Sequence, residues 1–129
     1  MAEAAYPEDL LYHPEHDWAR IDGDQATLGI TWFAQEALGE VVFFEPPEVG
    51  SSVSKDAPYA EVESVKAVSD VIAPLSGEIV AVNDTLADNP QTINEDPYGE
   101  GWLVKVRLSE PAEREALLDA AAYTASLAS

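Results

Sequence analysis

The sequence contains no cysteine and few basic residues, and each shortage excludes a class of function. Without cysteine, the chain forms no disulfide, thiolate zinc site or cysteine nucleophile. Its six lysines and arginines stand against 25 aspartates and glutamates, which gives a formal net charge of −19. Such a charge opposes binding to nucleic acid, to an anionic membrane and to a second copy of the chain. We therefore expect a monomer with neither a nucleic acid nor a membrane partner.

Long apolar runs and the motifs of a catalyst are also missing. No run approaches the roughly 20 apolar residues that span a membrane. Residues 1–18 contain no lysine or arginine and resemble neither a secretory signal nor a transit peptide, so we expect a cytoplasmic protein. The seven glycines are dispersed, with no phosphate-binding loop, and no serine-centred nucleophile elbow is present. The acidic residues form no pair in an apolar setting, and we do not expect an enzyme.

The sequence does contain enough apolar residues for a core, because 47% of its 129 residues are hydrophobic. We expect one domain that covers residues 1–129. Apolar and alternating runs, bounded by glycine and proline turns, predict short strands at residues 17–21, 26–30, 41–44, 58–62, 70–73, 78–82 and 103–107. This pattern is typical of a mostly β fold, a flattened sandwich or barrel with short helices added.

Two helices are predicted beside these strands. Thr31 is suited to cap a short helix over residues 32–38. A C-terminal helix is predicted to begin at Pro111 and to carry Leu117, Leu118 and Ala121 at helical spacing. Residues 123–127 are expected to continue it after a break or to form a second short turn. The segments expected to lack regular structure are residues 51–57 and 83–97.

Lys66 is the most informative single residue. It lies between the predicted strands 58–62 and 70–73, with the small apolar neighbours Val65 and Ala67. A lysine raised on the tip of a hairpin is what an enzyme needs in order to acylate one particular amine. The alternative is an ordinary solvated lysine that protects an exposed strand from aggregation.

Other residue clusters have plainer interpretations. His13 and His16, the two histidines, are candidates for a metal site, but Pro14 separates them and no third ligand is evident, which favours a surface or packing role. Residues 98–102 combine two glycines with two aromatic residues, which favours a tight turn with aromatic packing over a binding role. The aromatic pair at residues 32 and 33 is expected in the core.

The sequence resembles the glycine cleavage system H proteins over nearly its whole length, roughly residues 11–128. The matching segments are residues 16–18, 28–31, 34–43, 47–50, 62–70, 74–78 and 93–102. The two most specific are Val62-Glu63-Ser64-Val65-Lys66-Ala67-Val68-Ser69-Asp70 and Ile93-Asn94-Glu95-Asp96-Pro97-Tyr98-Gly99-Glu100-Gly101-Trp102.

The resemblance implies a lipoyl carrier with the biotinyl/lipoyl-carrier type of fold, in which Lys66 bears lipoic acid through an amide. The carrier would take the aminomethyl group of glycine from glycine decarboxylase (P protein) to aminomethyltransferase (T protein). Dihydrolipoamide dehydrogenase (L protein) would then reoxidise it. The resemblance also implies that Asp17 and Asp70 lie near the amine of the loaded arm, and that Glu63 helps lipoylating enzymes to find the lysine.

The sequence departs from the family at three places. Asp17 stands where glutamate is usual, Trp32 replaces a residue that is more often polar, and residues 55–56 lack the usual glycine. Two other functions stay open at this point: an H-like protein that mainly donates lipoate to other complexes, and an interaction module if the lysine is unmodified. A biotinyl carrier is disfavoured because Val65 and Ala67 replace that family's two methionines.

Overall fold

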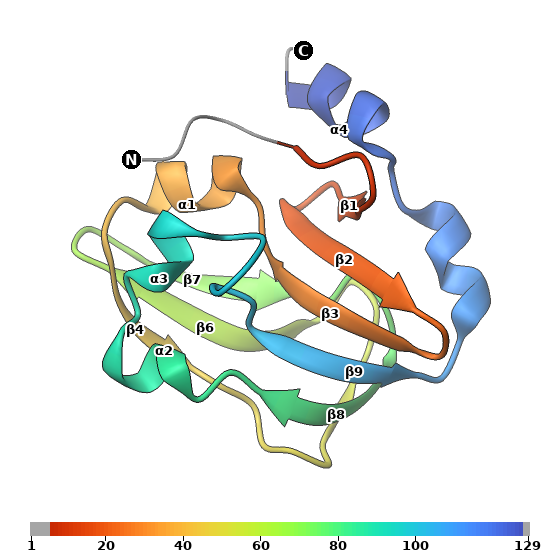
Figure 1. The fold of residues 1–129 in the computed structure, drawn as a ribbon, viewed down its shortest axis with the longest axis horizontal. Helices are drawn as coiled ribbons and strands as arrows, with labels where there is room; N and C mark the ends of the chain where they lie inside the picture. The colour runs from red at the N-terminus through yellow and green to blue at the C-terminus, as the bar shows by residue number, and fades with distance from the viewer. Residues whose placement is uncertain (1–5, 128–129) are drawn as a thin grey trace.

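The computed structural model describes residues 6–127, which form two antiparallel sheets with short helices around them (Figure 1). The larger sheet has six strands in the order β1-β2-β3-β9-β8-β5, and the smaller has three in the order β4-β6-β7. The strands of the larger sheet are β1 Leu11–His13, β2 Asp17–Asp22, β3 Gln25–Ile30, β9 Val104–Leu108, β8 Gly77–Val82 and β5 Ser52–Val53. Those of the smaller sheet are β4 Val41–Glu45, β6 Pro58–Ser64 and β7 Val68–Ile72.

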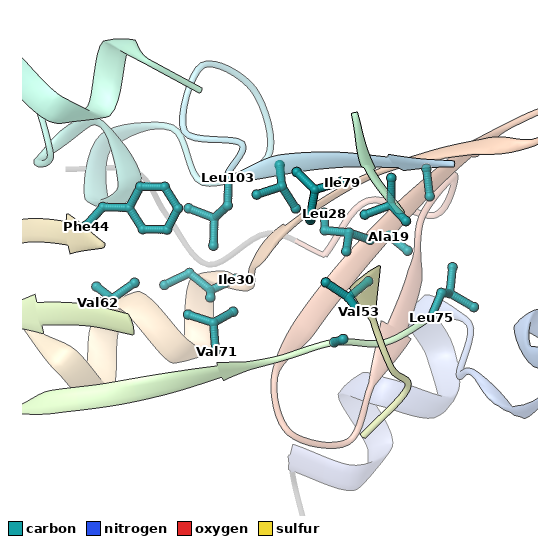
Figure 2. Close-up of a cluster of buried hydrophobic side chains, with 14 of the residues drawn as sticks. Ala19, Leu28, Ile30, Phe44, Val53, Val62, Val71, Leu75, Ile79 and Leu103 are labelled. Atoms are coloured by element: carbon teal, nitrogen blue, oxygen red, sulfur yellow. The ribbon is translucent and has the colours of Figure 1, made fainter. Parts of the chain in front are cut away.

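The main core lies between the two sheets. Figure 2 shows Val62 and Val71 of the smaller sheet pointing toward Ile30, at the end of β3, and Leu103, just before β9, on the larger sheet. All four side chains are buried. Burying an aliphatic side chain of this kind stabilises the fold by about 1.5–3 kcal/mol. The sandwich therefore rests on the inward side chains of short strands, and the predicted mostly β fold is confirmed.

A second core of aromatic residues joins the two ends of the chain. Tyr12 on β1 stacks on Tyr123 of α4 Ala120–Leu127, with ring centroids 4.8 Å apart and ring planes 9° from parallel. Trp18 on β2 is fully buried, and its indole Nε1 donates a hydrogen bond to the Pro97 carbonyl at 3.0 Å. The C-terminal helix thus packs onto the first strands, as Figure 1 shows.

The first predicted helix has the expected bounds. α1 spans Trp32–Leu38, and the Thr31 hydroxyl caps it by accepting a hydrogen bond from the Ala34 amide at 3.2 Å. Gly39 ends the helix with φ 81° and ψ −157°, a conformation that is essentially restricted to glycine.

The segment at residues 83–97, predicted as a loop, contains two one-turn helices instead. These are α2 Thr85–Asp88 and α3 Thr92–Glu95. Each helix is anchored by one buried side chain, Leu86 or Ile93, and a single anchor produces no periodic signal in the sequence. Two short strands were also missed, β1 and the two-residue β5, which lies in the predicted polar connector.

The predicted C-terminal helix begins at Pro111 and has the expected break, but Leu117 and Leu118 lie in the break rather than on a helix. Residues Pro111–Ala116 form a 3₁₀ helix, and the chain is then extended through Leu118 before α4 begins. Leu118 exchanges two backbone hydrogen bonds of 2.8 Å with Tyr12, so a long-range bridge overrides the local helical spacing. No helix within residues 6–127 is both long enough and apolar enough to cross a membrane.

We predict that Gly29→Ala destabilises the protein, because a Cβ at this position would lie 2.6 Å from ring carbons of the buried Trp18. Overpacking of this kind costs about 1–3 kcal/mol. Urea unfolding followed by tryptophan fluorescence measures the change. Thr27→Ala, at a half-exposed position of the same strand, is the control and should cost less than about 1 kcal/mol. Equal costs for the two variants would contradict the packing argument.

Candidate functional site

Lys66 lies at the tip of the hairpin formed by β6 and β7. The two strands reach closer to the lysine than predicted, and a four-residue turn over residues 64–67 joins them. The Ser64 amide donates to the Ala67 carbonyl at 2.8 Å, and the Ser64 hydroxyl accepts from the Lys66 and Ala67 amides at 3.2 and 3.1 Å. The turn is therefore built by its own backbone and one serine side chain, which leaves the lysine side chain uncommitted.

The surroundings of the lysine are apolar and exposed. Val65 and Val68 on either side of the turn are 65% and 59% exposed. Within residues 6–127, no carboxylate forms an ion pair with the Lys66 ammonium. A solvated amine that no carboxylate holds is accessible to an enzyme that modifies it.

A groove of about 320 Å³ runs between the hairpin and α1. Phe33 and Ala37 line it from the helix, and Val62 lines it from β6. The groove also brings together two of the predicted site residues, Asp17 and Asp70, which are 53 positions apart in the numbering. The other two, Lys66 and Glu63, do not line the groove; Glu63 lies half-buried on β6 beside the turn.

Asp17 is the unusual residue of this groove. It is 2% exposed, and its Oδ2 atom is buried without a hydrogen-bond partner among the described residues. Burial raises the pKa of Asp17 well above its ordinary value, and the nearby Glu15 carboxylate raises it further. Tyr59 has a buried hydroxyl that likewise lacks a partner. A buried carboxyl group with an unused oxygen can accept a hydrogen bond from a ligand in the groove.

His16 and Phe33 also line the groove, which sequence reasoning missed. The two rings are in contact, with centroids 4.5 Å apart, and His16 has a φ of 75°, which is uncommon for a residue other than glycine. His16 Nδ1 lies 2.8 Å from the Tyr123 hydroxyl of α4. Burial lowers the pKa of His16. Phe33 was expected in the core, but it is 38% exposed.

The two histidines have separate hydrogen-bond partners, Tyr123 for His16 and Asp56 for His13. The Glu15 amide donates to His13 Nδ1 at 3.0 Å, so Nε2 carries the proton and donates to Asp56 Oδ1 at 2.6 Å. Asp56 has a φ of 72°, which explains why glycine is suited to this turn. Two hydrogen bonds lower the pKa of Asp56: the larger effect comes from His13 and the smaller from Lys55.

Residues 98–102 form the predicted tight turn with aromatic packing. The ring centroids of Tyr98 and Trp18 are 6.1 Å apart. The Tyr98 hydroxyl accepts a hydrogen bond from the Trp32 amide at 2.8 Å. Gly101 has no space for a side chain, because a Cβ there would approach the Asp96 carbonyl oxygen to 2.7 Å. This motif supports the fold around Trp18 rather than a binding site.

Known proteins are similar to this chain in sequence and in fold. A family model described as "Glycine cleavage H-protein" matches residues 10–129. The glycine cleavage system H protein of Rubrobacter xylanophilus is 61% identical over 107 residues, which cover 83% of this chain and 85% of the relative. That of Symbiobacterium thermophilum is 54% identical over 122 residues, 95% of each chain.

A solved structure agrees with the sequence comparison. The crystal structure of a glycine cleavage system H protein from Mycobacterium marinum superposes with a TM-score of 0.85 at 44% identity. The match covers 95% of this chain and 99% of that one. Fold, sequence and length therefore agree, and the chain belongs to the glycine cleavage H-protein family.

Proposed function

We propose that Lys66 is the lysine to which the lipoyl group of this H protein is attached. Members of the family are lipoyl carriers of the glycine cleavage system and not catalysts, and the lipoyl group is bound to a lysine. The chain has two other lysines, Lys55 and Lys105. Lys55 is paired with Asp56 at 3.0 Å, and Lys105 lies over the Trp102 ring at 5.2 Å. The exposed, unpaired position of Lys66 at a hairpin tip is the observation that carries the assignment.

The hairpin serves to present a tethered group to successive enzymes. When attached, the lipoyl group supplies a dithiol/disulfide that carries the aminomethyl group of glycine and is then reoxidised. The family implies interaction with the P, T and L proteins of the glycine cleavage system. A tether at the tip of a rigid hairpin raises the local concentration of its end group at each docked enzyme without any catalytic residue on the carrier.

The groove beside the hairpin suits the amine of the aminomethyl cargo. Asp17 supplies a buried oxygen without a partner, and Asp70 is exposed at the same groove. A carboxylate–ammonium hydrogen bond is among the stronger ones in a protein, and it favours the protonated form of the amine. We propose that these two residues hold the cargo amine, shielded by the apolar walls of the groove.

The same tip serves the enzymes that attach the lipoyl group. Glu63 lies just before the turn, and the exposed Val65 and Val68 flank the lysine. This combination suits a partner with an apolar slot for the tip and a basic group opposite Glu63. We propose that lipoylating enzymes recognise these residues together with Lys66.

We further propose that residues 1–129 act as one carrier domain, as a cytoplasmic monomer. The family model spans most of this range, and a net charge of −19 makes copies of the chain repel one another. The lipoate-donor alternative is not favoured, because the relatives are named for the glycine cleavage system.

We predict that the protein gains the mass of one lipoyl group when incubated with lipoate, ATP and a lipoate ligase, and that Lys66→Ala abolishes the gain. Intact mass spectrometry measures both. Lys55→Ala and Lys105→Ala are matched controls that should accept the group as the wild type does. A lipoyl mass on Lys66→Ala would show that the assignment is wrong.

We predict that Asp70→Asn and Asp17→Asn each release ammonia from the loaded carrier several-fold faster than the wild type, because the amine loses a carboxylate partner. Loaded protein is separated from the partner enzymes, and ammonia is followed over time. Glu63→Gln lies outside the groove and should leave the rate unchanged. If neither aspartate variant differs from Glu63→Gln, the groove does not hold the amine.

Asp17 also predicts a pH effect on stability. Folding raises the pKa of Asp17. The contribution of this residue to folding stability is therefore fully present below the unfolded-state pKa of about 3.9, and it is lost as the pH rises toward the folded-state pKa. Asn does not ionise, so Asp17→Asn should become more stable relative to wild type as the pH rises above about 4. Unfolding free energies at a series of pH values test this. A difference that stays constant with pH would contradict the raised pKa.

A further inference from the structure

The tip of the hairpin contacts a segment outside the hairpin, residues 39–41, which connects α1 to β4. The Val65 amide, next to Lys66, donates to the Glu40 carbonyl at 3.0 Å. The Lys66 side chain lies against Gly39, since a Cβ on Gly39 would be 3.4 Å from Lys66 Cε. The place of the lysine therefore depends on where this connecting segment lies.

Asn94 holds the same segment from its other side. Its Oδ1 accepts a hydrogen bond from the Val41 amide at 2.8 Å, and its Nδ2 donates to the Gly39 carbonyl at 2.8 Å. These contacts fall on either side of Glu40, whose carbonyl binds Val65. One amide side chain thus fixes the residue before and the residue after the one that holds the tip.

The third contact of Asn94 extends this network into α1. Nδ2 also donates to Gln35 Oε1 at 2.9 Å, and Gln35, which is 4% exposed, donates through Nε2 to the Trp32 carbonyl at 3.1 Å. Asn94 itself belongs to α3, which lies next to α1 (Figure 1) and is anchored by the fully buried Ile93. Asn94 is therefore held both by α1, through Gln35, and by its own helix α3, through the buried Ile93.

We propose that Asn94 is a positioning residue for Lys66. By fixing the segment from Gly39 to Val41, it sets the position of the Glu40 carbonyl and of the surface over which the lysine side chain lies. Enzymes that attach or use a group on this lysine need it in one place, because small displacements of a reacting group cost large factors in rate. The inference rests on the proposed assignment of Lys66.

Asn83 offers a matched control within the chain. It is 6% exposed, donates through Nδ2 to the carbonyls of Glu100 and Trp102 at 2.8 Å each, and accepts from the Thr85 amide at 3.2 Å. Its chemistry and its three side-chain hydrogen bonds match those of Asn94, but none of these bonds reaches residues 39–41 or the hairpin. An effect common to both variants reports general stability, whereas an effect of Asn94 alone reports positioning.

The first measurement is amide hydrogen exchange at Val65, with the Ile79 amide of the larger sheet as a reference for global opening. Ile79 donates to the Ser51 carbonyl at 2.8 Å. In Asn94→Ala, Val65 should exchange roughly tenfold faster than in wild type, after correction for Ile79, because the hydrogen bonds that hold its acceptor segment are lost. In Asn83→Ala, Val65 should be unchanged after the same correction.

The second measurement is steady-state lipoylation by a lipoate ligase with lipoate and ATP. If the tip is in the competent position for only a fraction of the time, the KM for the carrier is divided by that fraction, and so rises, while kcat is kept. We expect the KM of Asn94→Ala to rise roughly tenfold with kcat within about twofold of wild type. Asn83→Ala should show wild-type values.

Equal effects of the two alanine variants, or no effect of Asn94→Ala, would overturn the proposal. If Asn94→Ala does not fold, Asn94→Asp replaces it, because aspartate keeps the acceptor for Val41 and loses the donors to Gly39 and Gln35; it should shift Val65 exchange in the same direction. If wild-type protein is lipoylated elsewhere than at Lys66, the proposed function fails. Val65 exchange still decides whether Asn94 holds the tip.

Discussion

The burial of Val62 and Val71 between the two sheets fixes the hairpin on which the site is built. Side chains on a strand alternate between its two faces, so a valine that must face the core also decides which neighbours face outward. With Val62 inside, the turn over residues 64–67 begins at a defined distance from the core and always presents the same lysine. A slip of one residue in this register would expose the valines and move the lysine out of place.

The acidic residues lie mostly at the surface, outside this core. Nearly all of the acidic residues are at least partly exposed, and solvent screens them. Among residues 6–127, Asp17 is the one buried acidic residue, and it lines the groove beside the hairpin. A buried carboxyl group with an unused oxygen is destabilising until it gains a hydrogen-bond partner, and the proposed cargo amine would be such a partner.

Local patterns predicted the elements that carry their own signals. Thr31 and Gly39 mark the ends of α1 because a cap and a left-handed glycine act within a few residues. The strands around Lys66 were found for the same reason, although their ends lie nearer the lysine than alternation alone indicated. The errors occur where a distant partner decides the structure: Leu118 pairs with Tyr12, and Leu86 and Ile93 each anchor a single helical turn.

The sequence by itself determined the class of fold, the lysine at the hairpin tip and the family, because each depends on neighbours within one short segment or on direct resemblance. Only the tertiary structure decided that the place where Asp17 and Asp70 meet is a groove, that His16 and Phe33 line it, and that Asn94 holds the segment beside Lys66. These residues come from separate elements, and the distance between them follows from how the two sheets and α3 pack. Packing of that kind depends on contacts between residues far apart in the chain, which no local pattern records.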